Sequence, residues 1–223
     1  MFINDIPRSS YGAIMLGTPE VSPATITPEN IVFRNGTNFI NNRSTIGLKS
    51  IKCNIAFLGN DYHDIQLKRS NFRAALLGKI NIAFEKDRFQ YFCTYNSDNE
   101  LEHEHENAAV SIFNFTGVQH EALETAESKT VFCRSTVPET DCVIKCLCNG
   151  SYIKLNIAGV IFPYTADNYE CVIDGINKKI MYGGNDVIAE FIKFPVLSPG
   201  INTLSIDTNK FYSITVEYYP TYL

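Results

Sequence analysis

The sequence predicts a mainly β protein with one short helix, divided into two domains. A chain of 223 residues can bury one large core or two smaller ones. Its 15 Phe and 12 Tyr, with Trp absent, favour pleated surfaces on which flat side chains pack. Short apolar stretches separated by Gly, Asn and Pro recur along the chain, a pattern that is typical of strands and turns.

The N-terminal part contains several such stretches, among them AIMLG, NIVFRNG and LKSIKCNIAF. In the last of these, Ile51, Cys53, Ile55 and Phe57 keep the two-residue period of a strand with one buried face. The period slips by one residue after Leu48, which indicates a β-bulge.

The segment DIQLKRSNFRAALLGK predicts the helix. Its apolar side chains and one arginine stem recur at helical spacing, at positions Ile65, Arg69, Phe72, Ala75 and Leu76. Asp61 or Asp64 can cap the start, and Gly78 suits the left-handed end.

The domain boundary is expected after the strand-like segments INIAFE, RFQYFCTYN and AVSIFNFTG. The next segment, HEALETAESK, has few large apolar side chains and is typical of a linker or a short surface helix. We therefore expect a first domain over residues 1–125, a linker over 126–135 and a second domain over 136–223.

The second domain reads as a series of short strands at intervals of roughly 8–12 residues, the rhythm of a β-sandwich. The sequence from Asp174 to Asn177 predicts a hairpin turn. In FPVLSPGINTLSID, Pro199 fixes φ and Gly200 accepts the positive φ of a type II turn. The alternating residues that follow are expected to face a core; they are Leu204, Ile206, Tyr212, Ile214, Val216 and Tyr218.

Two clusters of metal-ligating residue types occur, and neither has the spacing of a metal site. His103 and His105 would share one face of a strand, but no second His or Cys cluster supplies further ligands nearby. Cys142, Cys146 and Cys148 lack the C-x₂-C spacing of structural zinc and are better explained as small core hydrophobes. The sequence predicts no bound metal.

No catalytic or cofactor motif is present in the sequence. It contains no G-x-S-x-G elbow, cysteine-protease signature, P-loop or G-x-G-x-x-G. The paired carboxylates Glu100 and Glu102 lie in a polar run with nothing nearby that would raise a pKa. We therefore expect neither enzyme activity nor a cofactor.

Charge and hydropathy exclude several classes of partner. A formal net charge of −5, from 19 basic and 24 acidic residues, argues against a protein that grips nucleic acid through clustered Lys and Arg. No stretch approaches the ~20 consecutive apolar residues that span a bilayer, and the first residues lack the pattern of a secretory signal. We expect a soluble protein made in a cytoplasm, with no membrane partner, no sequence-specific nucleic-acid binding and reduced cysteines.

Several motifs occur in a characteristic order: MFINDIPRSSYGAIMLG, LKRSNFRAALLGK, AVSIFNFTG, the run from CVIDG to NTLSID, and VEYYPTYL. In this order and spacing the chain resembles the phage distal tail protein family over nearly its full length. The most specific part resembles a family turn motif, whose positions here are Phe194, Pro195, Leu197, Pro199, Gly200 and Asn202.

This resemblance implies a structural protein of a bacteriophage virion, located at the tail tip or baseplate and assembled in the host cytoplasm. The first domain would be a β-sandwich-like belt that forms a homo-oligomeric ring, commonly a hexamer, around a channel for DNA. The second would be a galectin-like β-sandwich that serves as a docking platform. The implied partners are the tail tube protein, the tail-associated hub or tip protein, and receptor-binding or other baseplate proteins.

An alternative from a different class is a soluble carbohydrate-binding β-sandwich module for host-surface adhesion, since a fold does not transfer function. Glycan binding without a ring would favour that alternative.

The polar run from Ser97 to Glu106 is broken only by Leu101 and allows two interpretations. It carries five acids with no Lys or Arg among them: Asp98, Glu100, Glu102, Glu104 and Glu106. The simpler interpretation is a solvated surface loop. The sharper one is a loop that lines the ring's channel and repels DNA phosphates within the Debye length of about 8–10 Å.

Overall fold

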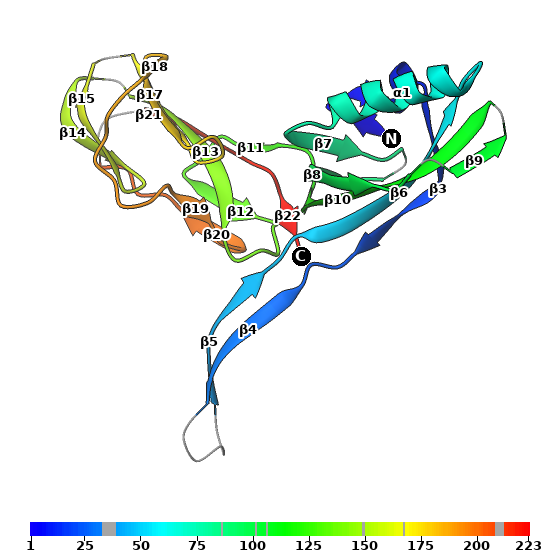
Figure 1. Ribbon diagram of the computed structural model, residues 1–223. Helices are drawn as coiled ribbons and strands as arrows, with labels where there is room; N and C mark the ends of the chain where they lie inside the picture. Colours follow the sequence, from blue (N-terminus) through cyan, green and yellow to red (C-terminus); the bar gives the residue numbers. More distant parts are fainter. Residues whose placement is uncertain are drawn as a thin grey trace. The chain divides into compact units, whose positions relative to one another are not determined.

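The computed structural model describes residues 1–32, 39–85, 87–100, 102–105, 107–148, 150–166, 168–207 and 212–223. The chain divides into two compact units, Met1–His120 together with Leu223, and Glu121–Tyr222 (Figure 1). In chain order the elements are β1 (Phe2–Ile3), β2 (Ile6–Pro7), the 3-10 helix η1 (Arg8–Tyr11), β3 (Ala13–Ser22), β4 (Ile26–Val32), β5 (Phe39–Ile46), β6 (Lys49–Leu58), α1 (Tyr62–Ala75), β7 (Lys79–Ala83), β8 (Gln90–Asp98), β9 (Glu102–His105), β10 (Ala108–His120), β11 (Glu124–Ala126), β12 (Thr130–Cys133), β13 (Thr140–Cys148), β14 (Tyr152–Ile157), β15 (Val160–Thr165), β16 (Glu170–Asp174), β17 (Lys179–Tyr182), β18 (Asn185–Asp186), β19 (Val196–Leu197), β20 (Gly200–Thr203), β21 (Tyr212–Tyr218) and β22 (Thr221–Tyr222).

The first unit is built on one antiparallel sheet with the strand order β2-β1-β7-β8-β10-β6-β3, and β9 pairs with β10. Within this sheet β6 and β10 pair without a break, from Leu58 opposite Ala108 to Lys49 opposite Gly117. The alternating positions predicted to be buried in β6 are all fully buried; they are Ile51, Cys53, Ile55 and Phe57. Leu48 is 53% exposed and precedes β6, so the slip in period marks the start of the strand and not a bulge in it.

The helix prediction is confirmed by α1, which lies against the sheet of the first unit (Figure 1). Asp61 is its N-cap, because the Asp61 carboxylate accepts a hydrogen bond from the backbone N–H of Asp64 at 2.8 Å. Gly78, three residues after the helix, has a φ of +82°, as expected at a left-handed end. The buried residues of α1 are Ile65 and Phe72.

Phe72 anchors α1 in an aromatic cluster. Its ring packs edge-on against Phe113 of β10, with 5.0 Å between ring centroids, and against Phe57 of β6, with 5.8 Å. Tyr11 of η1 contacts the same ring at 6.0 Å. The core of the first unit therefore joins the helix to β6 and β10.

β4 and β5 form a two-stranded ribbon and pair only with each other among the described strands. Figure 1 shows the ribbon continuing from β3 and β6 and extending clear of the first unit's sheet. The ribbon is closed at its base by a hydrogen bond from the Gly47 N–H to the Thr25 carbonyl, at 2.7 Å. An isolated two-stranded hairpin is only marginally stable in water, so this ribbon lacks the packing that usually stabilises strands.

The second unit contains an antiparallel sheet with the order β11-β21-β13-β16-β17-β18, and β19 pairs with β13. Two further ribbons, β12 with β20 and β14 with β15, belong to the same unit. Its core takes side chains from the sheet and from the ribbons, for example Ile144 of β13 and Val216 of β21 from the sheet and Leu155 of β14 from a ribbon.

The predicted hairpin and core positions of this unit are confirmed where the structure describes them. Residues 175–178 connect β16 to β17, and the Asp174 carboxylate accepts hydrogen bonds from the N–H groups of Ile176 and Asn177. Leu204, Ile214, Val216 and Tyr218 are buried and Ile206 packs against the same core. The side chain of Tyr212 lies outside the described residues.

The segment expected to be a linker or a short surface helix contains strands. β11 covers Glu124–Ala126 and pairs with β21, while β12 covers Thr130–Cys133 and pairs with β20. In β12 the buried residues are Val131 and Cys133, whereas Phe132 is 65% exposed. Strands this short leave too few residues for their period to be recognised in the sequence.

The predicted fold class is confirmed. Within the described ranges α1 is the one α-helix, and the remaining regular structure is almost entirely antiparallel strands. In that same part of the chain, no helix has the length and hydropathy that crossing a membrane requires.

Candidate functional site

Asp98, the first of the five predicted acids, does not face solvent. It ends β8, and its side chain is 4% exposed and lies against α1. Arg69 of α1 donates two hydrogen bonds to Asp98 Oδ2, from Nε at 2.9 Å and from Nη2 at 2.5 Å. Arg73, one helical turn further on, places Nε 3.5 Å from Asp98 Oδ1. One buried carboxylate therefore lies between two guanidinium groups.

Tyr95 and Asn99 complete this cluster. The Tyr95 hydroxyl donates to Asp98 Oδ1. Burial raises the pKa of Tyr95, and its hydrogen bond to Asp98 raises that pKa further, so the phenol stays protonated and remains a donor. Asn99 accepts a hydrogen bond from Arg69 through its carbonyl, and its side chain accepts from the Ile112 N–H of β10. These bonds tie the end of β8 to both α1 and β10.

The rest of the acidic run is placed only in part. Glu100 is exposed. Glu102 and Glu104 belong to β9, which pairs with β10, so part of the segment expected to be a loop is a strand. Their side chains, and the whole of Glu106, lie outside the described residues.

The two candidate metal clusters are described only in part. His103 and His105 lie in β9, opposite Ala109 and Ala108, and the register shifts between these two pairs. No group of three or more His, Cys, Asp or Glu that could hold a metal occurs within the described part of the chain. The side chains of His103 and His105 are not among those described, so the absence of metal at these histidines stays a prediction.

The cysteines behave as core residues where their side chains are described. Cys142 and Cys146 are fully buried, and Cys171 lies opposite Cys146 on the neighbouring strand. Burial raises the pKa of Cys53, Cys93 and Cys142 to about 12, which leaves these thiols protonated at neutral pH. The side chain of Cys148 is not described.

The predicted turn motif of the second unit forms a tight connection between β19 and β20. Gly200 has a φ of +93°, which an L side chain would strain. The Asn202 side chain accepts from the Ser198 N–H at 2.9 Å and donates to the Ser198 carbonyl at 2.7 Å, bridging the turn around Pro199. Leu197 is buried, Phe194 packs against the core, and the Pro195 carbonyl accepts a weak bond from the Cys142 thiol. These contacts give the motif a structural role.

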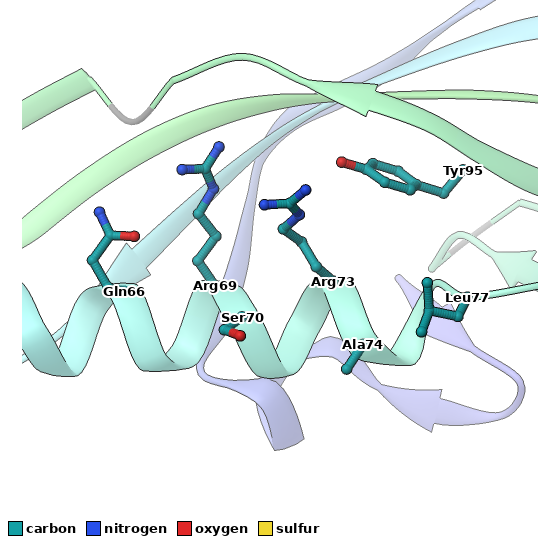
Figure 2. Close-up of a pocket in the computed structure, with 7 residues that line it drawn as sticks. All are labelled: Gln66, Arg69, Ser70, Arg73, Ala74, Leu77 and Tyr95. Atoms are coloured by element: carbon teal, nitrogen blue, oxygen red, sulfur yellow. The ribbon is translucent and has the colours of Figure 1, made fainter.

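A pocket of about 490 Å³ lies beside the Asp98 cluster. Figure 2 shows Gln66, Arg69 and Arg73 extending from α1 toward the side on which Tyr95 lies. The complete lining is Gln66, Arg69, Ser70, Arg73, Ala74, Leu77 and Tyr95. None of these residues is acidic. The sequence analysis missed this site, although Arg69 and Arg73 stand one helical turn apart and Arg69 falls among the apolar positions of the helix.

Comparison with known proteins gave matches among solved structures. No protein-family model matches the sequence, and a search of curated proteins found no match. The crystal structure of the Dit protein of phage SPP1 superimposes with a TM-score of 0.71 and 12% sequence identity, over 99% of this chain and 98% of that chain. That protein is described as a paradigm of the hub adsorption apparatus in phages that infect Gram-positive bacteria.

Two structures of the phage p2 baseplate in its activated conformation also match, one with strontium and one with calcium. Their TM-scores are 0.52 and 0.50, each at 9% identity over 92% of this chain and 90% of the other. At these identities the likeness concerns the fold, and it confirms the fold-level resemblance expected from the order of the sequence motifs. The chain therefore has the fold of a phage distal tail protein over nearly its whole length.

Proposed function

We propose that this chain is a structural protein of a bacteriophage tail tip. It forms a ring that connects the tail tube to the baseplate and serves as a docking hub, with a central channel for DNA. The observation that carries the proposal is the match to the SPP1 Dit protein over 99% of the chain. The proposed role is non-enzymatic, with the tail tube protein and baseplate proteins as partners and the virion tail as location.

The first unit is the proposed ring-forming part, because it offers strand edges that are unpaired within the described chain. β3 ends one side of its sheet, and β4 with β5 forms a ribbon that pairs with no other described strand. Ile26 of this ribbon is 55% exposed. Unpaired strand edges readily pair with a strand of a neighbouring chain. When one surface patch of each subunit binds a different patch of the next subunit, the subunits form a ring if the rotation between them closes on itself.

Removal of the ribbon is expected to abolish the ring and leave the first unit folded. Residues 26–46 would be replaced by an Asn-Gly turn, which fits because Thr25 and Gly47 are already joined by a backbone hydrogen bond. Mass photometry should detect the oligomer for the unaltered chain and only monomer for the variant, while circular dichroism should show folded protein in both. Ile188→Ser, at a residue of the second unit that is 93% exposed, is the control and should keep the oligomer.

A ring that survives loss of the ribbon would assign assembly to another surface. An unaltered chain that stays monomeric at micromolar concentration and binds glycans would contradict the proposed function and favour the carbohydrate-binding module.

The acidic run is proposed to line the channel of this ring through Glu100, Glu102, Glu104 and Glu106. Asp98 is left out of this proposed channel surface, because its charge is buried against Arg69. A ring multiplies the remaining four carboxylates by the number of subunits, and their repulsion of phosphates acts within about 8–10 Å.

Changing these four glutamates to Lys is expected to slow or stall DNA ejection from assembled virions and to leave ring assembly intact, because the channel wall would then attract phosphates. Ejection is followed by the release of DNA from purified phage. The matched control changes four exposed acids of the second unit to Lys: Glu127, Glu139, Glu170 and Asp186. Normal DNA ejection by the variant with four Glu→Lys changes would mean that the acidic run is an ordinary surface segment.

A further inference from the structure

The pocket beside α1 contains more positive than negative charge. Asp98 is a single carboxylate, yet it lies between the guanidinium groups of Arg69 and Arg73. Its oxygens are already used by Arg69, by the Tyr95 hydroxyl and by the Nε edge of Arg73. Two arginines and one buried aspartate leave one net positive charge at the pocket.

Arg73 is the group that presents this charge to a ligand. Its side chain is 52% exposed, whereas that of Arg69 is 15% exposed. Contact with Asp98 and attachment to a helix limit the rotamers of Arg73, so less freedom is lost when it binds a ligand. A planar guanidinium binds a carboxylate through two parallel hydrogen bonds, a geometry that Lys cannot provide.

The remaining lining residues extend the site beyond a single anion. Gln66 and Ser70 provide uncharged hydrogen-bonding groups, while Ala74 and Leu77 provide apolar surface. Leu77 is 77% exposed, so its side chain leaves apolar area that a ligand can cover. A volume of about 490 Å³ accommodates several side-chain groups and exceeds the needs of one carboxylate.

The distance between Arg73 and Leu77 along the pocket suggests the form of the ligand. Leu77 lies just past the end of α1, where its N–H donates to the Ala74 carbonyl at 3.4 Å, so it stays about one helical turn, or about 6 Å, beyond Arg73. Two residues of an extended peptide span about 6.6 Å. An extended segment with an acidic side chain and an apolar side chain two residues apart would therefore reach both Arg73 and Leu77.

We propose that this pocket is a docking site for an acidic segment of a different protein, of the pattern Glu-x-Leu, with the carboxylate on Arg73 and the apolar side chain on Leu77. Charge complementarity selects an acidic partner. The chain's own Glu-x-Leu sequence, from Glu121 to Leu123, fits less well, because Glu121 is 6% exposed and its carboxylate is already paired with Arg134 at 3.0 Å. The proposal is independent of the proposed function.

The test uses the full-length chain and the acetylated, amidated peptide Gly-Glu-Ser-Leu-Gly, titrated by ligand-observed NMR. The peptide with Gln in place of Glu should bind about tenfold more weakly, because a charge-assisted hydrogen bond is replaced by a neutral one. The peptide with Ser in place of Leu should also bind more weakly, because it leaves Leu77 uncovered.

Arg73→Gln should remove the preference for the Glu peptide, and Arg73→Lys should restore only part of it because the fork geometry is lost. Arg88→Gln is the matched control, since it removes an exposed arginine that does not line the pocket, and it should keep the full preference. Circular dichroism should show that each variant is folded.

Three results would overturn the proposal: no binding of the Glu peptide to the unaltered chain, equal binding of the Glu and Gln peptides, or a preference that persists in Arg73→Gln. Loss of self-association in Arg73→Gln, measured by sedimentation velocity, would show that the pocket takes a second copy and would also overturn it.

Discussion

Phe72→Ala is expected to lower the free energy of unfolding of the first unit by about 3–5 kcal/mol, the usual cost of truncating a fully buried Phe. Phe72 has no exposed surface, and its ring meets Tyr11, Phe57 and Phe113. Within α1 only Ile65 shares this degree of burial. A helix of 14 residues is marginal in water without packing, so losing one of two anchors should loosen it.

Urea unfolding followed by far-UV circular dichroism gives the change in stability, and hydrogen exchange reports on the amides of α1. Leu67→Ala is the matched control on the same helix, because Leu67 is 53% exposed and its loss should change stability by no more than about 0.5 kcal/mol. Equal effects of the two substitutions would mean that α1 is not held through its Phe72 face.

The helix could be predicted because its information is local. The burial of Ile65, Phe72 and Leu76 follows from one helical period, and the Asp61 cap lies directly before the first turn. The same holds for β6, in which alternate residues are buried. In each case the residues that form the element also identify its buried face.

Contacts between distant segments could not be predicted in this way. Asp98 lies among polar neighbours and was interpreted as solvated, but its partner Arg69 is 29 residues away on a helix. The polar composition of the run also concealed β9, because its pairing with β10 depends on backbone groups and not on apolar side chains. β11 and β12 were missed because strands of three and four residues show almost no period.

The pocket was missed for a related reason. Arg69 and Arg73 read as ordinary helix residues until β8 brings Asp98 and Tyr95 against them. By contrast, the turn around Gly200 was predictable, since Pro199, Gly200 and Asn202 act on their own backbone. Features that depend on neighbouring residues could therefore be predicted from the sequence. The candidate site could not, because it depends on the contact between α1 and β8.

Asp98→Asn is expected to lower the free energy of unfolding of the first unit by about 3 kcal/mol, because it leaves a largely buried arginine without its counter-charge. Asp98 is 4% exposed and Arg69 15%, so little solvent is available to replace the lost carboxylate. Glu100→Gln neutralises an exposed acid two residues away and is the matched control, with an expected change within about 0.5 kcal/mol.

A double-mutant cycle separates this pairing from a general loss of packing. Arg69→Met alone should also lower the free energy of unfolding, because the buried Asp98 carboxylate then loses its ion pair with Arg69. The double variant of Asp98→Asn and Arg69→Met should be less destabilised than the sum of the single changes, since neither charge then remains. If urea unfolding instead gives additive effects, or if Asp98→Asn resembles Glu100→Gln, then Asp98 is a solvated acid after all. In that case Asp98 rejoins Glu100, Glu102, Glu104 and Glu106 as a fifth candidate for the channel wall.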